Sequence, residues 1–105
     1  MNLCMLSLIV PDAIEDTIID WLLEQDEING FNSLSLFGHG SHESVMSFSE
    51  RVTGKASKKM FQSHVTEQQA NDILARLKKD FANADIHYMI RPLIDAGNLS
   101  NYETK

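Results

Sequence analysis

The sequence predicts one α+β domain: a four-stranded antiparallel sheet with two helices packed on one of its faces. The chain has 105 residues, enough for one hydrophobic core but not for two. Short apolar runs alternate with two segments whose apolar residues recur at helical spacing, and Gly, Asn and Pro mark the turns between them. Hydrophobic residues make up 43% and charged residues 23% of the chain, which is typical of a globular domain.

Residues Leu3–Val10 are expected to form the first strand, because they make a short apolar run that ends at Pro11. Cys4 is the only cysteine, so an internal disulfide is excluded and a buried side chain is expected. The run is apolar on both faces, unlike a strand that has one face in water. Its large side chains alternate: Leu6, Leu8 and Val10 on one face, and Leu3, Met5 and Ile9 on the other.

A helix and a second strand are expected next. Asp12 and Glu15 have the spacing of a capping box, which predicts that the helix begins there and ends near Gln25. Asn29-Gly30 favours a turn, and the alternating residues of Phe31–Phe37 predict the second strand. The apolar stripe of the helix, expected in the core, is Ile14, Ile18, Trp21 and Leu22.

Residues 38–58 are expected to form a long polar loop between the second and third strands. Gly, Ser, Thr and charged residues dominate this segment, and its ends can extend the two strands as a ribbon. The third strand is predicted over Lys59–Val65.

Thr66 and Gln69 form a second capping-box pattern, which predicts the start of the second helix. The fourth strand is expected over Ile86–Ile90. The domain is expected to span residues 1–99, followed by a frayed tail over residues 100–105. The apolar stripe of the second helix is Ala70, Ile73, Leu74, Leu77 and Phe81.

The predicted order, β-α-β-β-α-β, is that of the ferredoxin-like fold. Two helices cover only one face of its sheet, so the second apolar face of Leu3–Val10 needs another cover. A symmetric homo-oligomer packed sheet to sheet is the simplest cover, and the long loop folded back over this face is the alternative.

The chain resembles the PII-like superfamily, which includes the PII nitrogen-signalling proteins and the CutA divalent-cation tolerance proteins. It is most similar to an uncharacterised PII-like family often associated with bacterial heavy-metal efflux. The resemblance covers the chain to about Leu99 and rests on three segments: Gly38-His39-Gly40, the stretch from Glu50 to Lys55, and Lys58-Lys59.

This resemblance implies a homotrimeric regulator with ligand sites in the clefts between subunits. The loop over residues 38–58 would contact a partner, for example a metal-efflux transporter. Arg91, at the end of the fourth strand, either points to a cleft between subunits or pairs with an acidic neighbour. The usual ATP site is in doubt, because the Phe81–Asp85 connection has no glycine-rich phosphate-binding run. The ligand and partner residues implied in the loop are Gly38, His39, Gly40, Glu50, Arg51, Lys55, Lys58 and Lys59.

A metal-binding or metal-buffering module is an alternative function. His39 and His42, with Glu43 beside them, are ligand types that suit Zn²⁺, Cu²⁺ or Ni²⁺. Two imidazoles are too few alone, so Glu43, His64 or another subunit would supply a further ligand, and solvated loop histidines are the simpler interpretation. His64 and His87 fall in strands and are expected to be packed and hydrogen-bonded.

The formal net charge of −6 argues against nucleic acids and anionic membranes as partners. No membrane-spanning run and no signal-peptide pattern is found, so a cytoplasmic protein is expected. Residues 38–59 contain Arg51, Lys55, Lys58 and Lys59 against Glu43 and Glu50, a net charge of +2. This charge favours an anionic ligand or an acidic partner, and a solvated face on which Glu50 and Arg51 balance each other is the alternative.

No recognisable enzyme motif appears. The sequence has no G-x-S-x-G elbow, Walker loop, dinucleotide fingerprint or H-E-x-x-H helix. We therefore expect a regulator, with a small enzyme that uses the clefts between subunits as a second alternative.

Overall fold

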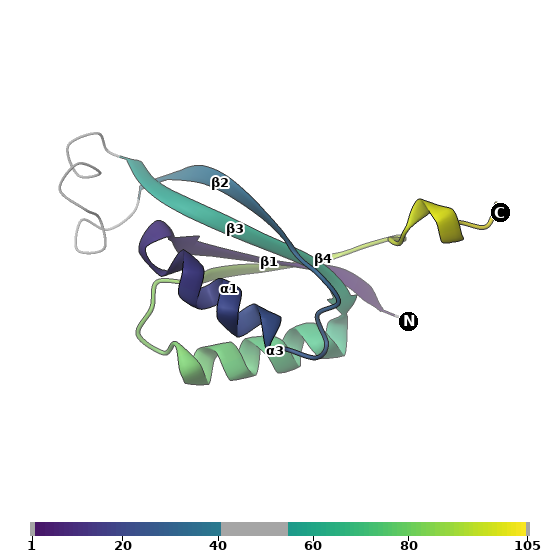
Figure 1. The fold of residues 1–105 in the computed structure, drawn as a ribbon, viewed down its shortest axis with the longest axis horizontal. Helices are drawn as coiled ribbons and strands as arrows, with labels where there is room; N and C mark the ends of the chain where they lie inside the picture. The colour runs from purple at the N-terminus through teal and green to yellow at the C-terminus, as the bar shows by residue number, and fades with distance from the viewer. Residues whose placement is uncertain (1, 41–54, 105) are drawn as a thin grey trace.

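The structure is a computed structural model that describes residues 2–40 and 55–104. Its four strands form one antiparallel sheet in the order β2-β3-β1-β4, and both helices lie on the same face of it (Figure 1). The predicted α+β, ferredoxin-like fold is therefore confirmed. The elements are β1 (Leu3–Pro11), α1 (Glu15–Leu23), β2 (Asn32–His39), β3 (Lys55–Thr66), α3 (Glu67–Asp80) and β4 (His87–Pro92), with single 3₁₀ turns at Asp12–Ile14 and Leu99–Asn101.

The core lies between the helices and β1, which pairs with β3 on one side and with β4 on the other. Cys4 is buried as predicted, and this burial raises the pKa of its thiol. Trp21 and Phe81 belong to the core region and their rings pack edge to face. The remaining core side chains from these elements are Leu6, Leu8, Val10, Ile18, Leu22, Ala70, Ile73 and Leu77.

The two predicted capping boxes have different outcomes. In α3 the box is present: the N–H of Gln69 donates to Thr66 Oγ1 (3.1 Å), and the N–H of Thr66 donates to Gln69 Oε1 (2.9 Å). Such a cap contributes about 1 kcal/mol. The box predicted at Asp12 is wrong, because the chain leaves β1 through a 3₁₀ turn and α1 begins at Glu15 without a side-chain cap. The Asp12 carboxylate instead lies 3.6 Å from Lys59 Nζ.

β2 and β3 are longer than predicted and form the expected ribbon. β3 begins at Lys55 rather than at Lys59, and β2 continues to His39, so that Gly38 pairs with Ala56 and His39 pairs with Lys55. Pairing satisfies the backbone groups of both segments, which favours strand over loop even for polar residues. Residues 38–39 and 55–58, predicted as loop, therefore belong to the sheet.

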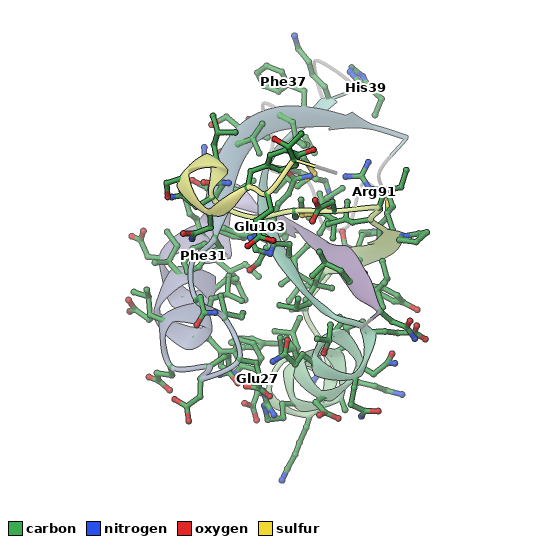
Figure 2. The ribbon with its side chains drawn as sticks, turned by 90° about the vertical axis from the view of Figure 1, so that its right-hand side faces the viewer. Glu27, Phe31, Phe37, His39, Arg91 and Glu103 are labelled. Carbon is green, nitrogen blue, oxygen red and sulfur yellow. The ribbon has the colours of Figure 1, made fainter. Side chains whose placement is uncertain are left out.

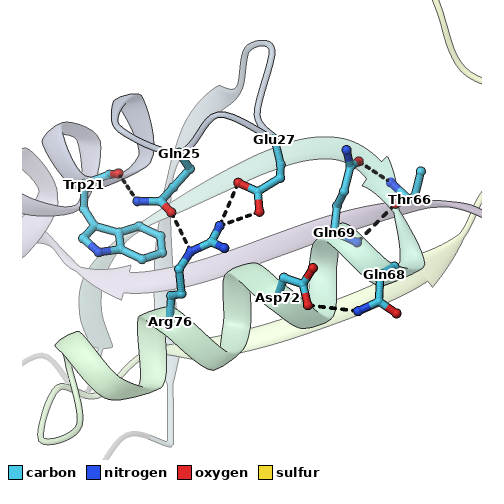
Figure 3. Close-up of polar contacts among 8 residues, drawn as sticks. All are labelled: Trp21, Gln25, Glu27, Thr66, Gln68, Gln69, Asp72 and Arg76. Atoms are coloured by element: carbon cyan, nitrogen blue, oxygen red, sulfur yellow. Dashed lines mark hydrogen bonds and ion pairs between the residues drawn. The ribbon is translucent and has the colours of Figure 1, made fainter.

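A polar network connects α3 to the segment that follows α1 (Figure 3). Arg76 donates to both carboxylate oxygens of Glu27 at 2.7 Å and to Gln25 Oε1 at 2.9 Å. The amide of Gln25 in turn donates to the carbonyl oxygen of Trp21 (2.9 Å). One guanidinium nitrogen of Arg76 makes both contacts to Glu27, and together these bonds connect the segment after α1 to α3.

Replacing Glu27 with Gln tests this network through its pH dependence. The hydrogen bond from Arg76 holds the pKa of Glu27 below its ordinary value of 4.5. The stabilisation is therefore present above that ordinary value and is lost as pH falls through the lower pKa of the folded state. We expect Glu27→Gln to lower the melting temperature at pH 7. The loss in free energy of unfolding should be no more than about 1 kcal/mol, because the pair is partly solvated. The difference should disappear in strong acid.

Thermal unfolding followed by circular dichroism across this pH range measures the effect. The matched control is Glu24→Gln, an exposed carboxylate at the end of α1. Identical pH profiles for Glu27→Gln and the wild type would mean that the pair contributes nothing to stability.

Candidate ligand site on the uncovered face of the sheet

The sheet face opposite the helices, called here the open face, is bare in the described part of the chain and is partly apolar. Leu34 is 45% exposed and Met89 43% exposed on this face. Strand register places on it Leu3, Met5, Ser7 and Ile9 from β1, and their neighbours Met60, Gln62 and His64 from β3. The predicted second apolar face of β1 is therefore present, and no described helix covers it.

A hollow of about 590 Å³ lies at the end of the open face where β2 ends and β3 begins. Register explains its composition: Lys58 is opposite Pro11 and His87 is opposite Ile9, so charged side chains come together where β1 ends. The residues that line the hollow are Ile9, Gly38, His39, Gly40, Lys58, Asp85 and His87.

Lys58 is the central charge of this hollow. Its side chain is only 7% exposed, and its Nζ lies 3.5 Å from Asp85 Oδ2. The other oxygen of Asp85 lies 3.2 Å from His87 Nε2. An ammonium has three N–H donors, so Lys58 can bind an oxygen of a ligand while it keeps its contact with Asp85.

The backbone at Gly38-His39-Gly40 forms the rim of the hollow. Gly40 has φ of +81°, in the left-handed region that glycine adopts without strain, and this allows the chain to turn out of β2. Gly38 has no side chain to fill the hollow beside Lys58. Figure 2 shows His39 and Phe37 at the top of the view and Glu27 at the bottom.

The three predicted lysines are separated by the alternation of β3. Lys58 lines the hollow, whereas Lys59 is on the other face, where its Nζ donates to Ser35 Oγ (2.8 Å). Lys55 Nζ lies 4.9 Å above the ring of Phe37. Strand pairing over these residues therefore leaves only Lys58 as the cation of the hollow among the described lining residues.

Arg91 lies on the open face but outside the hollow. It is exposed and is opposite Met5, which separates it from His64 (Figure 2). The expectation that His64 and His87 are packed is wrong, because both side chains are exposed on this uncovered face. His87 does have a polar partner, Asp85.

The metal hypothesis is not tested by the described residues. His39 lies at the hollow, but His42 and Glu43 fall outside the described ranges, as do Glu50 and Arg51. Within residues 2–40 and 55–104, no group of three or more His, Cys, Asp or Glu is arranged to hold a metal ion. The roles given to these four residues stay predictions.

Ile9, Asp85 and His87 were not among the predicted site residues. Asp85 lies in the connection before β4, and only the pairing of β4 with β1 brings it beside Lys58. The available signal was the order of the strands: with β1 between β3 and β4, the residues near the start of β4 lie across the end of β1 from Lys58.

No helix in the described part of the chain is long and apolar enough to cross a membrane. No match to the chain is found among curated proteins.

Solved structures share this fold over most of their length. A DUF3240 family protein from Shewanella baltica OS155 is 22% identical, with a TM-score of 0.76 over 94% of this chain and 98% of that one. CPII, a nitrogen regulatory PII-like protein from Thiomonas intermedia K12, bound to ADP, AMP and bicarbonate, is 20% identical, with a TM-score of 0.66 over 89% and 91%. Its apo form is 16% identical, with a TM-score of 0.65 over 89% and 90%.

At these identities the structural comparisons establish a shared fold, that of PII-like proteins. The sequence itself gives the family. Residues 1–100 match the family model described as a protein of unknown function (DUF3240), and the chain therefore belongs to the DUF3240 family.

Proposed function

We propose that this protein is a PII-like regulator that assembles as a homotrimer and binds a small anion in the Lys58 hollow, at a seam between copies. The observation that carries the proposal is a buried lysine at the rim of an uncovered, partly apolar sheet face. Ligand binding would control contacts made through residues 38–58 with a protein partner, such as a metal-efflux transporter.

The shape of one chain supports assembly. Its Cα radius of gyration is 15.5 Å, whereas a compact domain of this length has about 13 Å. Its extents are 52 × 28 × 20 Å, and Figure 1 shows the β2–β3 ribbon and the C-terminal segment extending from opposite ends. These extensions and the open face present apolar surface that a second copy can bury.

The chemistry of the hollow supports an anion. Lys58 supplies a charge, and the Gly38–Gly40 backbone lies beside it. CPII, which has the same fold, is bound to ADP, AMP and bicarbonate. A nucleotide is less well supported here, because residues 81–86 between α3 and β4 contain no glycine that could form a phosphate nest. We therefore favour an anion of the size of bicarbonate or phosphate.

Calorimetric titration with bicarbonate, inorganic phosphate and ADP tests the site. We expect Lys58→Met to abolish binding of the anion, because the buried cation is removed while most of the side-chain volume remains. Asp85→Asn should strengthen binding several-fold, since it removes the carboxylate that competes for Lys58. Lys59→Met is the matched control: it changes the neighbouring lysine on the opposite face and should bind like the wild type.

Light scattering on the same samples gives the mass of the assembly. A particle of one 11.9 kDa chain at micromolar concentration would contradict the trimer. Equal affinities for the wild type and Lys58→Met would remove the anion site.

Replacement of residues 41–54 with a short flexible Gly-Ser linker tests the partner contact, because it spares every residue of β2 and β3 and still connects His39 to its paired residue Lys55. We expect the variant to keep the mass of the assembly and its anion affinity, and to lose a partner captured by the full chain from detergent-solubilised membranes of the source organism. Capture of the same partner by the linker variant would refute this role for the segment.

A further inference from the structure

The C-terminal arm, residues 93–104, leaves the domain after β4 and runs clear of both helices (Figure 1). The N–H of Leu93 donates to the carbonyl oxygen of Leu3 (3.0 Å), which fixes the root of the arm beside β1. Beyond this root the arm presents three large side chains to solvent: Ile94 is 105% exposed, Leu99 84% and Tyr102 57%.

The end of the arm has a built conformation. Asn98 Oδ1 accepts from the N–H of Ser100 (2.9 Å), and the N–H of Tyr102 donates to the carbonyl oxygen of Leu99 (3.0 Å). These bonds hold one 3₁₀ turn. A segment that is ordered locally while it exposes its apolar side chains is preorganised for docking, because less conformational entropy is lost on binding.

The same chain has an apolar groove of about 470 Å³ between α3 and β4. Tyr88 borders it and is 61% exposed, and Lys78 is a charged residue at its edge. β4 is an edge strand, so its outer backbone groups lie beside the groove. Its apolar lining consists of Leu74, Ala75, Leu77, Phe81, Ala82, Ala84, Ile86 and Tyr88.

We propose that the arm of one copy docks, through Leu99 and Tyr102, into the α3–β4 groove of a second copy. The inference rests on the proposed assembly and adds a contact that the open face does not make. The charges of the two surfaces are complementary: Asp95 and Glu103 are on the arm, and Lys78 is at the groove.

The starting point of the arm favours a second copy over its own chain. β4 ends beside the first turn of α3, where Pro92 and Leu93 share a hollow with Glu67. The arm then continues away from α3 (Figure 1), so it would have to reverse its direction to enter the groove of its own chain. A neighbouring copy can offer its groove without such a reversal.

Disulfide trapping between two differently tagged chains tests the contact. One chain has Ala75→Cys in the groove and the other has Asn101→Cys in the arm, and the two are refolded together under mild oxidation. We expect a linked product that contains one of each chain. Adding Leu99→Asp to the arm chain should reduce its yield about tenfold or more, the factor expected for the loss of one buried leucine contact. Native Cys4 is buried, with a raised thiol pKa, and does not compete.

The control pair replaces Ala75→Cys with Asp16→Cys on the exposed surface of α1 and should give no enriched product. A single chain with both Ala75→Cys and Asn101→Cys tests fold-back: a loop closed within one chain at high dilution would overturn the proposal. If the assembly keeps its mass but no disulfide forms between the arm and the groove, the docking proposal is also overturned, while the proposed regulator is unaffected. A monomeric particle would remove both.

Discussion

The structure depends on one geometric constraint: two helices can shield only one face of a four-stranded sheet from solvent. β1 lies between β3 and β4 and is apolar on both of its faces, so burying Leu6 and Leu8 under the helices leaves Met5 and Ile9 on the other side. On that side Ser7 is buried, with its Oγ 3.4 Å from Gln62 Nε2, whereas Leu34 and Met89 remain exposed. The hydrophobic effect therefore favours adding a second layer, and the chain's own described residues supply none.

The same alternation gives the candidate site its chemistry. Adjacent strand residues point to opposite faces, so Lys59 is directed to Ser35 and Asp12 on the helix side, while Lys58 is directed to the open face. At the end of β1, Asp85 comes from the β4 side of this strand and Lys58 from the β3 side, and the two side chains lie 3.5 Å apart. Under the proposed assembly, a second copy would bury the apolar open face, and the charged hollow at its end would bind the ion.

Much of the fold could be predicted from local pattern, since Thr66 and Gln69 cap α3 as their spacing indicates and the order of elements holds. Two boundaries could not. Asp12 has the spacing of a cap, but the turn after Pro11 takes it to Lys59 instead, and the polar residues 55–58 become strand because β2 is there to pair with them. The site was predicted in part for a similar reason. The Gly38–Gly40 motif and Lys58 are visible in sequence, whereas Asp85 and His87 join them only through strand register.

The position of Lys58 also bears on how a bound anion could act at a distance under the proposed function. Lys58 lies two residues from Ala56, which pairs with Gly38, so a ligand held between Lys58 and the Gly38–Gly40 backbone would contact both strands at the base of the ribbon. In the free protein Asp85 balances the charge of Lys58, and an anion must compete with it. A ligand shifts a conformational equilibrium only by its difference in affinity between states. The exchange of Asp85 for a ligand at Lys58 would provide such a difference. In the free state the Lys58 ammonium contacts a carboxylate oxygen of Asp85, and in the bound state it would contact an oxygen of the anion.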